Sequence, residues 1–458
     1  MRFLIALLKG FAALAILAII AGIAWLYLAP PALIRVGAGY AAKIVCSNTF
    51  VANRDPHDVF QDDVQAPGNP LLGYFDLDVS EAKRSVTASF LGYFGSVTAI
   101  ARPGLGCAVV PDGNLAGARA YSAPAVPDGQ PSEALWPEGD NVQLSQNPAL
   151  NHILDDPGLA GPGMRALVVV KSGRIIGERY GGDFADDTPL IGWSMTKTVD
   201  AALVGTVIQA GKLKLDQQNL LPEWRNDKRK DISVADLMAM SSGLAFNEDY
   251  GDVSDVTRML FLEPDMAKFA ASMPLVSPIG KVFHYSSGTG VILARIWQNA
   301  VGDEKASLAW PQQALFGPLG MTSAVLETDE AGTFAASSYL YATARDWARF
   351  GLFLLEGGRW QGKQILPPGF VAMMHQPAPA SHDRYGKGLV WLVAPGQHVG
   401  DGAKAGLPGD TFWMDGHDGQ SIAIIPSKGL VVVRLGLTPG RLHYHPQALA
   451  AALVKALP

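Results

Sequence analysis

Two patterns typical of β-hairpins lie in distant parts of the chain, and together they constrain its fold more than any other feature. The first is Ala166–Lys171 followed by Arg174–Tyr180, joined by a Ser-Gly turn. The second is Ser421–Ile425 followed by Leu430–Leu435, joined by a turn that contains Pro and Gly. Short apolar runs bounded by such residues are typical of strands. A sheet is therefore expected to take strands from both parts of the chain.

The residues between these hairpins have mostly helical periodicity. A helix is predicted from Met195 to Gly211, and the helical pattern continues to about Gln376. Gly388–Val393 predicts one further strand, and Pro446–Leu457 predicts a terminal helix. We therefore expect an α/β fold, with a mixed, mainly antiparallel sheet flanked by helices and a large all-helical insertion.

The 458 residues exceed one small core, and we divide them into three segments. Residues 1–30 are predicted to be a transmembrane signal anchor, 31–150 an extracytoplasmic extension, and 151–458 the catalytic domain. The extension is rich in Pro and Gly, for example over residues 124–131, and we assign it no chemistry. Its predicted strands are Val86–Phe94, Val97–Ala101 and Cys107–Val110.

The N-terminus carries an uncharged apolar run from Phe11 to Ala29, and Pro30-Pro31 ends it. This run is long enough to cross a bilayer, which needs about 20 apolar residues. A cleaved signal peptide and a buried core helix are the alternatives. We expect residues 3–29 to anchor the chain in the inner (cytoplasmic) membrane as a single pass. The positive charges at Arg2 and Lys9 favour a cytoplasmic N-terminus and a periplasmic body.

Charge and cysteine content exclude some classes of partner. The formal charge is −6 and no basic run occurs, so the electrostatic pattern of a nucleic-acid-binding protein is absent. Cys46 and Cys107 are the two cysteines, and a disulfide between them would suit an exported domain. It would stabilise the fold by roughly 4 kcal/mol in the chain-entropy model. Two unrelated buried thiols are the alternative.

Two copies of Ser-x-x-Lys occur. Ser80-Glu-Ala-Lys83 lies in a charged stretch and is predicted to be surface. Ser194-Met-Thr-Lys197 opens an amphipathic helix, so the Lys197 ammonium can reach the Ser194 hydroxyl. Serine becomes nucleophilic when a neighbour takes its proton, and a partly buried lysine can do this. Helix N-capping is the alternative role of Ser194.

Tyr285 is the next candidate, in a loop that precedes another apolar helical run. A phenol near Lys197 can carry the proton between Ser194 and a leaving group, with Ser287 assisting. The alternative is an ordinary half-buried aromatic residue.

The third candidate element is Asp415-Gly-His417-Asp-Gly419-Gln420, ahead of an apolar strand. Here we expect the Gln420 N–H, together with the Ser194 N–H, to hold an oxyanion, and Gly419 to allow close approach of substrate. His417 is a substrate-site candidate or a plain turn residue. No G-x-S-x-G, H-E-x-x-H, P-loop or dinucleotide motif occurs, so no metal or cofactor is expected.

The order Ser-x-x-Lys, Tyr-x-Ser, His-x-Gly resembles the class C β-lactamase superfamily, which includes penicillin-binding proteins, esterases and 6-aminohexanoate-dimer hydrolases. The resemblance extends over about residues 160–437. It implies an α/β sandwich with a helical insertion, Ser194 as the acylated nucleophile, and Lys197 with Tyr285 as the acid/base pair. Further motifs that carry it are Leu237–Leu244, Pro318–Met321 and Tyr341–Phe350.

Two departures indicate the branch of this superfamily. Ser287 stands where β-lactamases have Asn, and His417-Asp-Gly419 stands in place of Lys-Thr-Gly, which weakens capture of a substrate carboxylate. Tyr285-Ser-Ser287 is closer to the 6-aminohexanoate-dimer hydrolase and esterase branch, and Trp193-Ser-Met-Thr-Lys197 resembles that branch too. We therefore expect a membrane-anchored hydrolase of a small ester or amide. A β-lactamase or D-amino-acid peptidase is the first alternative, and a receptor that merely binds or is acylated is the second.

Overall fold

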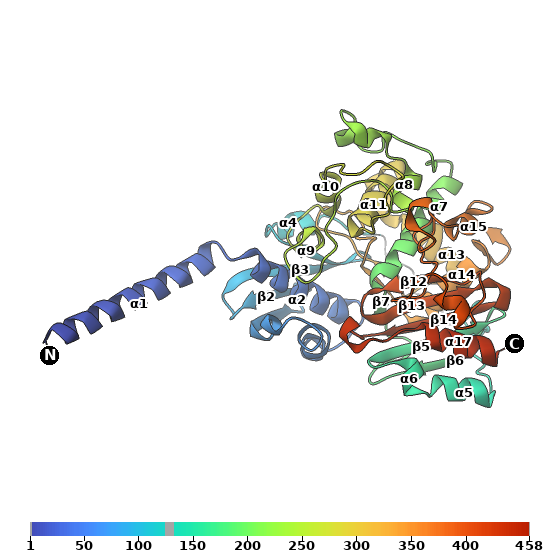
Figure 1. Ribbon diagram of the computed structural model, residues 1–458, viewed down its shortest axis with the longest axis horizontal. Coiled ribbons are helices and arrows are strands. Elements are labelled where there is room, and N and C mark those ends of the chain that lie inside the picture. The colour runs from blue at the N-terminus through green and yellow to red at the C-terminus, as the bar shows by residue number, and fades with distance from the viewer. Residues whose placement is uncertain (1, 124–131, 458) are drawn as a thin grey trace.

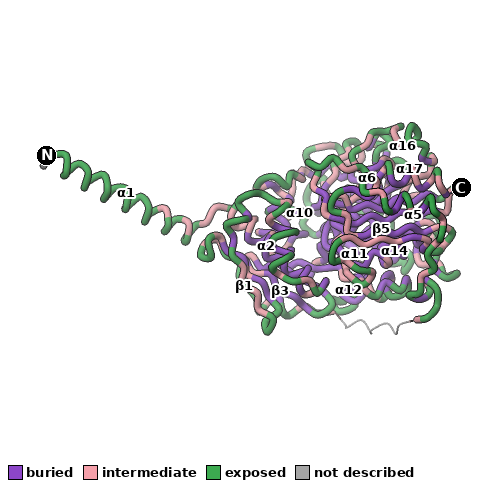
Figure 2. Tube along the Cα trace, turned by 90° about the horizontal axis from the view of Figure 1, so that it is seen from below, coloured by how far each residue is buried: buried purple, intermediate pink, exposed green. Residues whose placement is uncertain are grey.

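A computed structural model describes residues 2–123 and 132–457, so the Pro- and Gly-rich stretch 124–131 lies outside the described residues. The N-terminal helix α1 (Arg2–Leu28) projects away from the body, and its apolar side chains are exposed along its length (Figures 1 and 2). The segment Phe3–Leu28 is long and apolar enough to cross a membrane, and a signal sequence would have the same character. After Pro30-Pro31 the chain enters α2 (Ala32–Phe50), which is largely buried in the body.

Residues 32–118 form a helix packed on a sheet. The strands are β1 (Phe75–Ser80), β2 (Ser85–Phe90), β3 (Phe94–Arg102) and β4 (Gly106–Val110), antiparallel in that order, and α2 packs across β2, β3 and β4. The three predicted strand regions are present, and β1 was not predicted. The expected strand 86–94 is wrong at its end, because Leu91 and Gly92 have positive φ and turn the chain. Short helical turns complete this part at α3 (Pro56–Val59), η1 (Phe60–Gln65), η2 (Pro70–Tyr74) and α4 (Leu115–Ala118).

A five-stranded antiparallel sheet forms the centre of the molecule, in the order β12-β13-β14-β5-β6. Both predicted hairpins are confirmed within it, and they meet where Val433 of β14 pairs with Val168 of β5. This sheet confirms the expected fold class. The strands are β5 (Met164–Lys171), β6 (Arg174–Tyr180), β12 (Phe412–Gly416), β13 (Gln420–Ile425) and β14 (Leu430–Gly436).

Helices cover both faces of this sheet (Figure 1). On β5, Leu167 and Val169 face α5 (Pro148–Leu154) and α17 (Gln447–Ala456), whereas the alternate residues face α14 (Ala344–Leu355) and the rest of the core. Because both faces are buried, the strand is apolar without a break. The predicted terminal helix is therefore confirmed as α17.

The predicted strand Gly388–Val393 is wrong. Leu389 has φ +57°, which interrupts an extended chain, and only isolated bridges form there, between Trp391 and each of Tyr385 and Trp413. The apolar composition predicts a strand, but the segment is irregular, with Leu389 and Val390 buried and residues 391–393 partly buried.

The helical middle begins with α7 (Thr196–Gln209), the helix predicted after Met195. Ser286 and Thr343 cap two of its helices: each hydroxyl accepts a backbone N–H of the first turn, at 3.2 Å. The remaining helices are α6 (Pro157–Ala160), α8 (Val234–Met238), α9 (Asp255–Phe261), α10 (Met266–Ala271), α11 (Ser287–Val301), α12 (Glu304–Pro311), α13 (Gly317–Leu319), α15 (Phe370–Met374) and α16 (Asp401–Lys404). Small strands are β7 (Leu190–Ile191), β8 (Val325–Leu326), β9 (Leu340–Ala342), β10 (Arg359–Trp360) and β11 (Lys363–Gln364).

Residues 32–118, called here the N-terminal part, are joined to the body that holds the central sheet by buried polar contacts. The Lys43 ammonium of α2 pairs with the Glu327 carboxylate, and both side chains are almost fully buried. Glu327 also accepts the Cys107 backbone N–H at 2.6 Å. A disulfide joins Cys46 on α2 to Cys107 on β4. The buried core runs without interruption from α2 to the central sheet (Figure 2).

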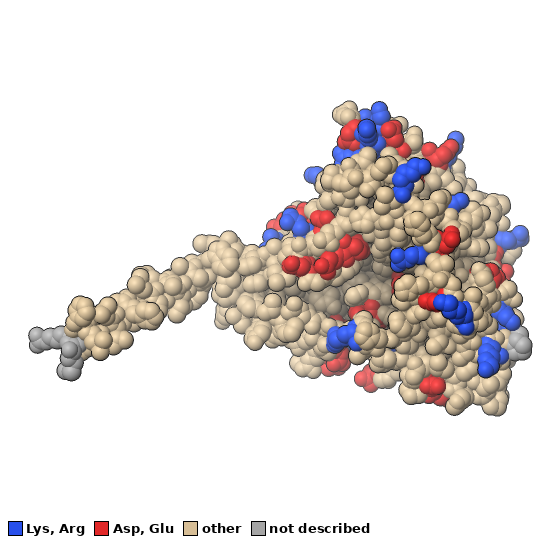
Figure 3. Space-filling model, viewed as in Figure 1, with Lys and Arg blue, Asp and Glu red and all other residues tan. Residues whose placement is uncertain are grey.

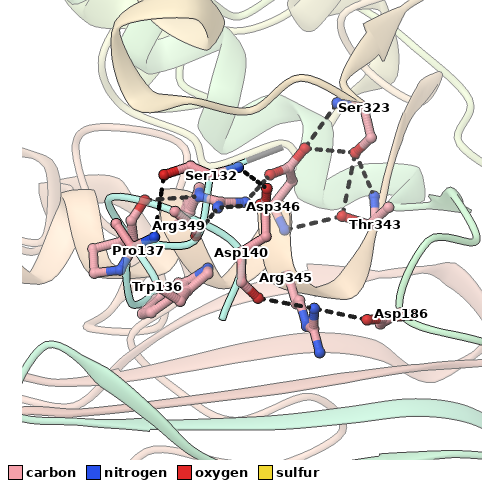
Figure 4. Close-up of polar contacts among 12 residues, drawn as sticks. Ser132, Trp136, Pro137, Asp140, Asp186, Ser323, Thr343, Arg345, Asp346 and Arg349 are labelled. Carbon is pink, nitrogen blue, oxygen red and sulfur yellow. Dashed lines mark hydrogen bonds and ion pairs between the residues drawn. The ribbon is translucent and has the colours of Figure 1, made fainter. Parts of the chain in front are cut away.

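A second set of contacts holds the segment before α5 on α14. The Arg349 guanidinium donates to the carbonyls of Pro137 and Gly139, at 3.3 and 2.9 Å, and pairs with Asp346 (Figure 4). Asp346 in turn accepts the Ser323 hydroxyl at 2.5 Å. Because charge-assisted bonds to backbone carbonyls fix position, residues 132–141 are held against the core.

Candidate active site

The loop that carries Ser194 is held in a tight turn between β7 and α7. Trp193 has φ +47°, a conformation that costs energy for a bulky residue and that its packing against Tyr339 and His417 compensates. Gly192 has no room for a side chain, since a Cβ would lie 2.2 Å from the Trp347 ring. Ser194 therefore occupies the 3₁₀ turn Trp193–Met195, directly before α7.

Lys197 lies on the first turn of α7 and is 1% exposed. Its ammonium donates to Ser194 Oγ at 3.0 Å, to Ser287 Oγ at 3.0 Å and to the Ser337 carbonyl at 2.9 Å. These partners use all three donors of an ammonium group. Burial lowers the pKa of Lys197 to about 8, although nearby carboxylates oppose this shift. A substantial fraction of Lys197 is therefore neutral at mildly alkaline pH and able to accept a proton.

Tyr285 approaches the same serine from the loop before α11. Its hydroxyl interacts with the Ser194 hydroxyl, and its ring centre is 4.9 Å from Lys197 Nζ. Burial raises the pKa of Tyr285 well above its usual value, so the phenol stays protonated and can donate. Trp391 and Tyr385 pack on the ring, at centroid distances of 5.4 and 6.0 Å, and hold it in place.

Glu248 is a site residue that the sequence did not reveal. Its carboxylate accepts both the Ser287 hydroxyl and, at 2.8 Å, the Ser287 N–H. Because the Ser287 proton points to Glu248, the Ser287 oxygen is free to accept from Lys197. A chain of contacts thus runs from Glu248 through Ser287 to Lys197 and Ser194. Glu248 lies in an irregular loop with no periodicity or motif, so only its position in the fold identifies it.

Gln420 lies elsewhere than we expected. It pairs with Gly416 across the β12–β13 hairpin, and its side-chain amide donates to the His417 carbonyl at 3.0 Å and accepts the Gly436 N–H at 2.8 Å. These contacts bind Gln420 to the turn and to β14, so its N–H is directed into the sheet and not toward Ser194. Gly419 is also a turn residue, with φ +83° and its carbonyl bonded to Arg434.

Asp415 lies on β12 at a position whose backbone N–H does not pair with β13. Trp413, two positions earlier, exchanges hydrogen bonds with Trp391 on the side of β12 away from β13. Backbone groups of alternate residues point to the same side, so the Asp415 N–H lies on that free edge. The neighbouring Gly416 packs against the nucleophile loop, since a Cβ there would lie 2.3 Å from the Gly192 carbonyl oxygen.

His417 lies at the rim of the site. Its side chain is 53% exposed, stacks on Tyr250 at 5.6 Å and meets the edge of Trp193 at 5.8 Å. The other Ser-x-x-Lys copy is exposed in the β1–β2 turn, where the Ser80 hydroxyl accepts the Lys83 N–H, which confirms it as surface.

Two carboxyl groups near Lys197, the partly buried Asp415 and the fully buried Asp200, complete the electrostatics. Burial raises the pKa of Asp415 to about 7, against the opposing charge of Lys197. Asp200, one turn beyond Lys197 on α7, accepts the Trp297 indole N–H at 2.9 Å, and burial raises its pKa well above the usual value. Asp200 therefore tends towards the neutral form, which limits how far it raises the pKa of Lys197.

Comparisons with known proteins agree with this geometry. Residues 155–456 match the family model described as Beta-lactamase. The 6-aminohexanoate-dimer hydrolase of Paenarthrobacter ureafaciens is 23% identical over 309 residues, which cover 61% of this chain and 74% of that protein. A Bacillus anthracis protein described as a 6-aminohexanoate-dimer hydrolase superposes with a TM-score of 0.53 at 23% identity, over 72% of this chain and 89% of that one. A penicillin-binding protein homologue from Caulobacter crescentus gives a TM-score of 0.52 at 16% identity, over 69% and 99%.

The fold and the family match define a serine hydrolase of the class that contains class C β-lactamases and penicillin-binding proteins. The chain belongs to the beta-lactamase family, which matches about two thirds of its length. The expected resemblance is therefore confirmed at the level of the superfamily.

Proposed function

We propose that this chain is a membrane-anchored hydrolase that cleaves an ester or amide bond through an acyl-enzyme on Ser194. The observation that carries the proposal is the contact of Ser194 with both Lys197 and Tyr285, a neutralisable base and a protonated phenol. A nucleophile within hydrogen-bond reach of such groups is the arrangement that acyl transfer requires.

The reaction follows from these contacts. Neutral Lys197 takes the Ser194 proton as Ser194 Oγ attacks the carbonyl carbon. The oxyanion accepts from the Ser194 N–H and, in place of the Gln420 N–H, from the Asp415 N–H at the free edge of β12. Tyr285 gives its proton to the leaving oxygen or nitrogen and recovers one from Lys197. Water, deprotonated by the same pair, then attacks the acyl-enzyme and releases the acid.

Anchoring in the inner membrane rests on α1, with the catalytic body in the periplasm. The described residues of α1 contain no acidic side chain, and no acidic side chain is visible on the projecting helix in Figure 3. The measurement is protease treatment of spheroplasts that express the full chain with a C-terminal tag. Degradation of the tag supports this orientation, and protection of the tag contradicts it.

Ser194→Ala tests the nucleophile, and Ser80→Ala, in the other Ser-x-x-Lys, is the matched control. Hydrolysis of p-nitrophenyl acetate by the detergent-solubilised full chain should fall by at least a thousandfold in Ser194→Ala and stay unchanged in Ser80→Ala. Retained turnover in Ser194→Ala would refute the proposal.

A β-lactamase or D-amino-acid peptidase is the second candidate, favoured by the structural similarity to penicillin-binding proteins. Rapid turnover of nitrocefin would support it over the esterase or amidase branch. A long-lived adduct in the intact mass, without turnover of any substrate, would instead indicate a receptor.

A further inference from the structure

A cavity of about 470 Å³ lies beside the nucleophile loop, between the N-terminal part and the hydrolase core. We propose that it holds a long, apolar acyl chain, so that the substrate is an ester or amide of a fatty acid drawn from the adjoining bilayer. The proposal rests on the function proposed above and names its substrate class. The volume is in the range of pockets that hold small organic ligands.

The lining is strongly apolar. Among the described residues, the cavity has no Lys or Arg in its wall, and the acidic groups there are Asp252 and Asp418. An anionic group in the cavity would have no Lys or Arg to pair with and would be repelled by the two carboxyl groups. An alkyl chain would instead be stabilised there, because its apolar surface is removed from water. The apolar members are Leu33, Ile34, Val36, Leu71, Leu72, Phe75, Phe90 and Phe261.

The inner end of the cavity adjoins the loop that carries Ser194, at Trp193. Trp193, adjacent to Ser194, lines it together with Tyr250 and His417, which stack on each other at the rim. Neither Ser194 nor Tyr285 lines it, as far as the described residues show, so the reacting carbonyl lies past Trp193, outside the cavity. We assign the cavity to the acyl part of the substrate because its inner wall adjoins the residue that is acylated.

The outer end of the cavity lies where α1 meets the body. Leu33 and Ile34 are in the first turn of α2, directly after Pro30-Pro31, and a Cβ on Gly95 would contact both Ile34 and Pro30. An apolar rim of five exposed side chains adjoins this end: Leu33, Leu71, Tyr74, Leu91 and Tyr93.

Two members of the apolar rim, Tyr74 and Leu91, are neighbours and adjoin the cavity wall. The Leu91 N–H bonds to the Tyr74 carbonyl at 2.8 Å, and the Tyr74 ring packs on Phe90, which also lines the cavity. Exposed apolar patches mark contact surfaces, and tyrosines are enriched where proteins meet the bilayer interface. A spanning α1 would place this rim at the membrane surface, so a lipid chain could pass from the bilayer into the cavity without crossing water.

The reaction then produces a free fatty acid. Ser194 Oγ forms a bond to the acyl carbon while the bond to the alcohol or amine breaks, and the leaving group departs with the proton from Tyr285. Water supplies the hydroxyl of the released acid and returns a proton to Ser194. The alkyl chain stays in the cavity throughout, so its burial should favour long-chain esters in kcat/KM.

The test measures hydrolysis of a p-nitrophenyl ester series, from acetate to palmitate, by the full chain. Each ester is supplied in two ways, dissolved in detergent and embedded in phosphatidylcholine vesicles. Each buried methylene can contribute up to about fourfold. We expect kcat/KM to rise at least tenfold from acetate to laurate. Faster hydrolysis of vesicle-embedded palmitate than of dissolved palmitate supports supply from the bilayer, whereas the reverse order overturns that supply. A flat or falling series overturns the acyl-chain assignment.

Variants locate the effect. Leu33→Glu and Leu71→Glu place a charge at two partly exposed cavity positions, and Leu115→Glu does so at a similarly exposed position that does not line it. We expect laurate hydrolysis to fall at least tenfold in the first two, acetate hydrolysis to stay within twofold, and Leu115→Glu to match the wild type. Equal laurate rates in all three variants would overturn the proposal.

A binding measurement separates this inference from the proposed function. Laurate should displace a fluorescent fatty acid from Ser194→Ala protein, and displacement should weaken at least tenfold when Leu33→Glu is added. Binding without any ester turnover by the wild type would refute the function but support the cavity. Turnover of p-nitrophenyl acetate without laurate binding would support the proposed function and refute the assignment of the cavity.

Discussion

The Glu248 carboxylate should set the pH at which the enzyme becomes active. Lys197 Nζ is 3.0 Å from Ser287 Oγ, which donates directly to Glu248, so the two charges lie within about 6 Å of each other. At an effective dielectric constant of about 20, a unit charge at that distance contributes about 2.8 kcal/mol, or about 2 pKa units. Because Glu248 is partly exposed, solvent screening reduces the effect to about 1–2 units.

Glu248→Gln removes this charge and keeps a hydrogen-bond acceptor for Ser287. If neutral Lys197 is the base, kcat/KM rises with pH through the pKa of Lys197, which is about 8. Loss of a carboxylate disfavours the ammonium form, so this midpoint should move down by about 1–2 units. The plateau should also fall, because the neutral amide holds Ser287 less firmly.

The assay is the pH dependence of kcat/KM for p-nitrophenyl acetate from pH 5 to 10, corrected for spontaneous hydrolysis. Glu263→Gln is the matched control, since Glu263 is partly exposed in the same insertion and pairs with Arg258. It should leave the midpoint unchanged. A Glu248→Gln midpoint that stays fixed or moves to higher pH, in a protein with wild-type thermal stability, would refute the coupling of Glu248 to Lys197.

Two further predictions concern packing. Lys43→Met leaves Glu327 buried without its cation and should lower the free energy of unfolding by about 3–5 kcal/mol, and Lys43→Met combined with Glu327→Gln should recover part of the loss. Urea denaturation followed by tryptophan fluorescence measures both, and a double variant as unstable as the single one would contradict this. Gly416→Ala pushes a methyl group against the Gly192 carbonyl and should lower kcat at least tenfold by displacing Ser194. Gly440→Ala, where a Cβ meets nothing, is its control, and equal kcat values for the two variants would count against a role of this close contact.

Local spacing accounts for the contacts among the predicted site residues. Ser194 and Lys197 are three residues apart on one helical turn, so their contact follows from the sequence, and the loop before an apolar helix was enough to nominate Tyr285. Glu248 could not be found in this way, because a loop residue reaches Ser287 only through the path of the chain. The position of the Gln420 N–H differs from the expectation for a related reason. Which residues of a hairpin face outward depends on the register, and a turn of three residues sets that register here.

The fold shows the same division between local and distant information. Hairpins with strong β-branched runs were found, because their strands pair with near neighbours. The segment 388–393 has a similar composition, but one residue with positive φ prevents a strand. The cavity was beyond sequence analysis, since its walls come from residues more than 300 positions apart, such as Leu72 and His417.

The buried pair of Lys43 and Glu327 bears on how far the chain can be shortened. The match to the family begins at residue 155, which suggests a truncation at that point. Such a truncation would remove the Lys43 ammonium and the Cys107 N–H, and the Glu327 carboxylate would remain buried without these two partners. It would also strip away one wall of the cavity while leaving every residue of the nucleophile loop in place. A surviving fragment would therefore be a hydrolase of altered selectivity, and sequence changes confined to residues 32–90 could alter what is hydrolysed with no change at the nucleophile.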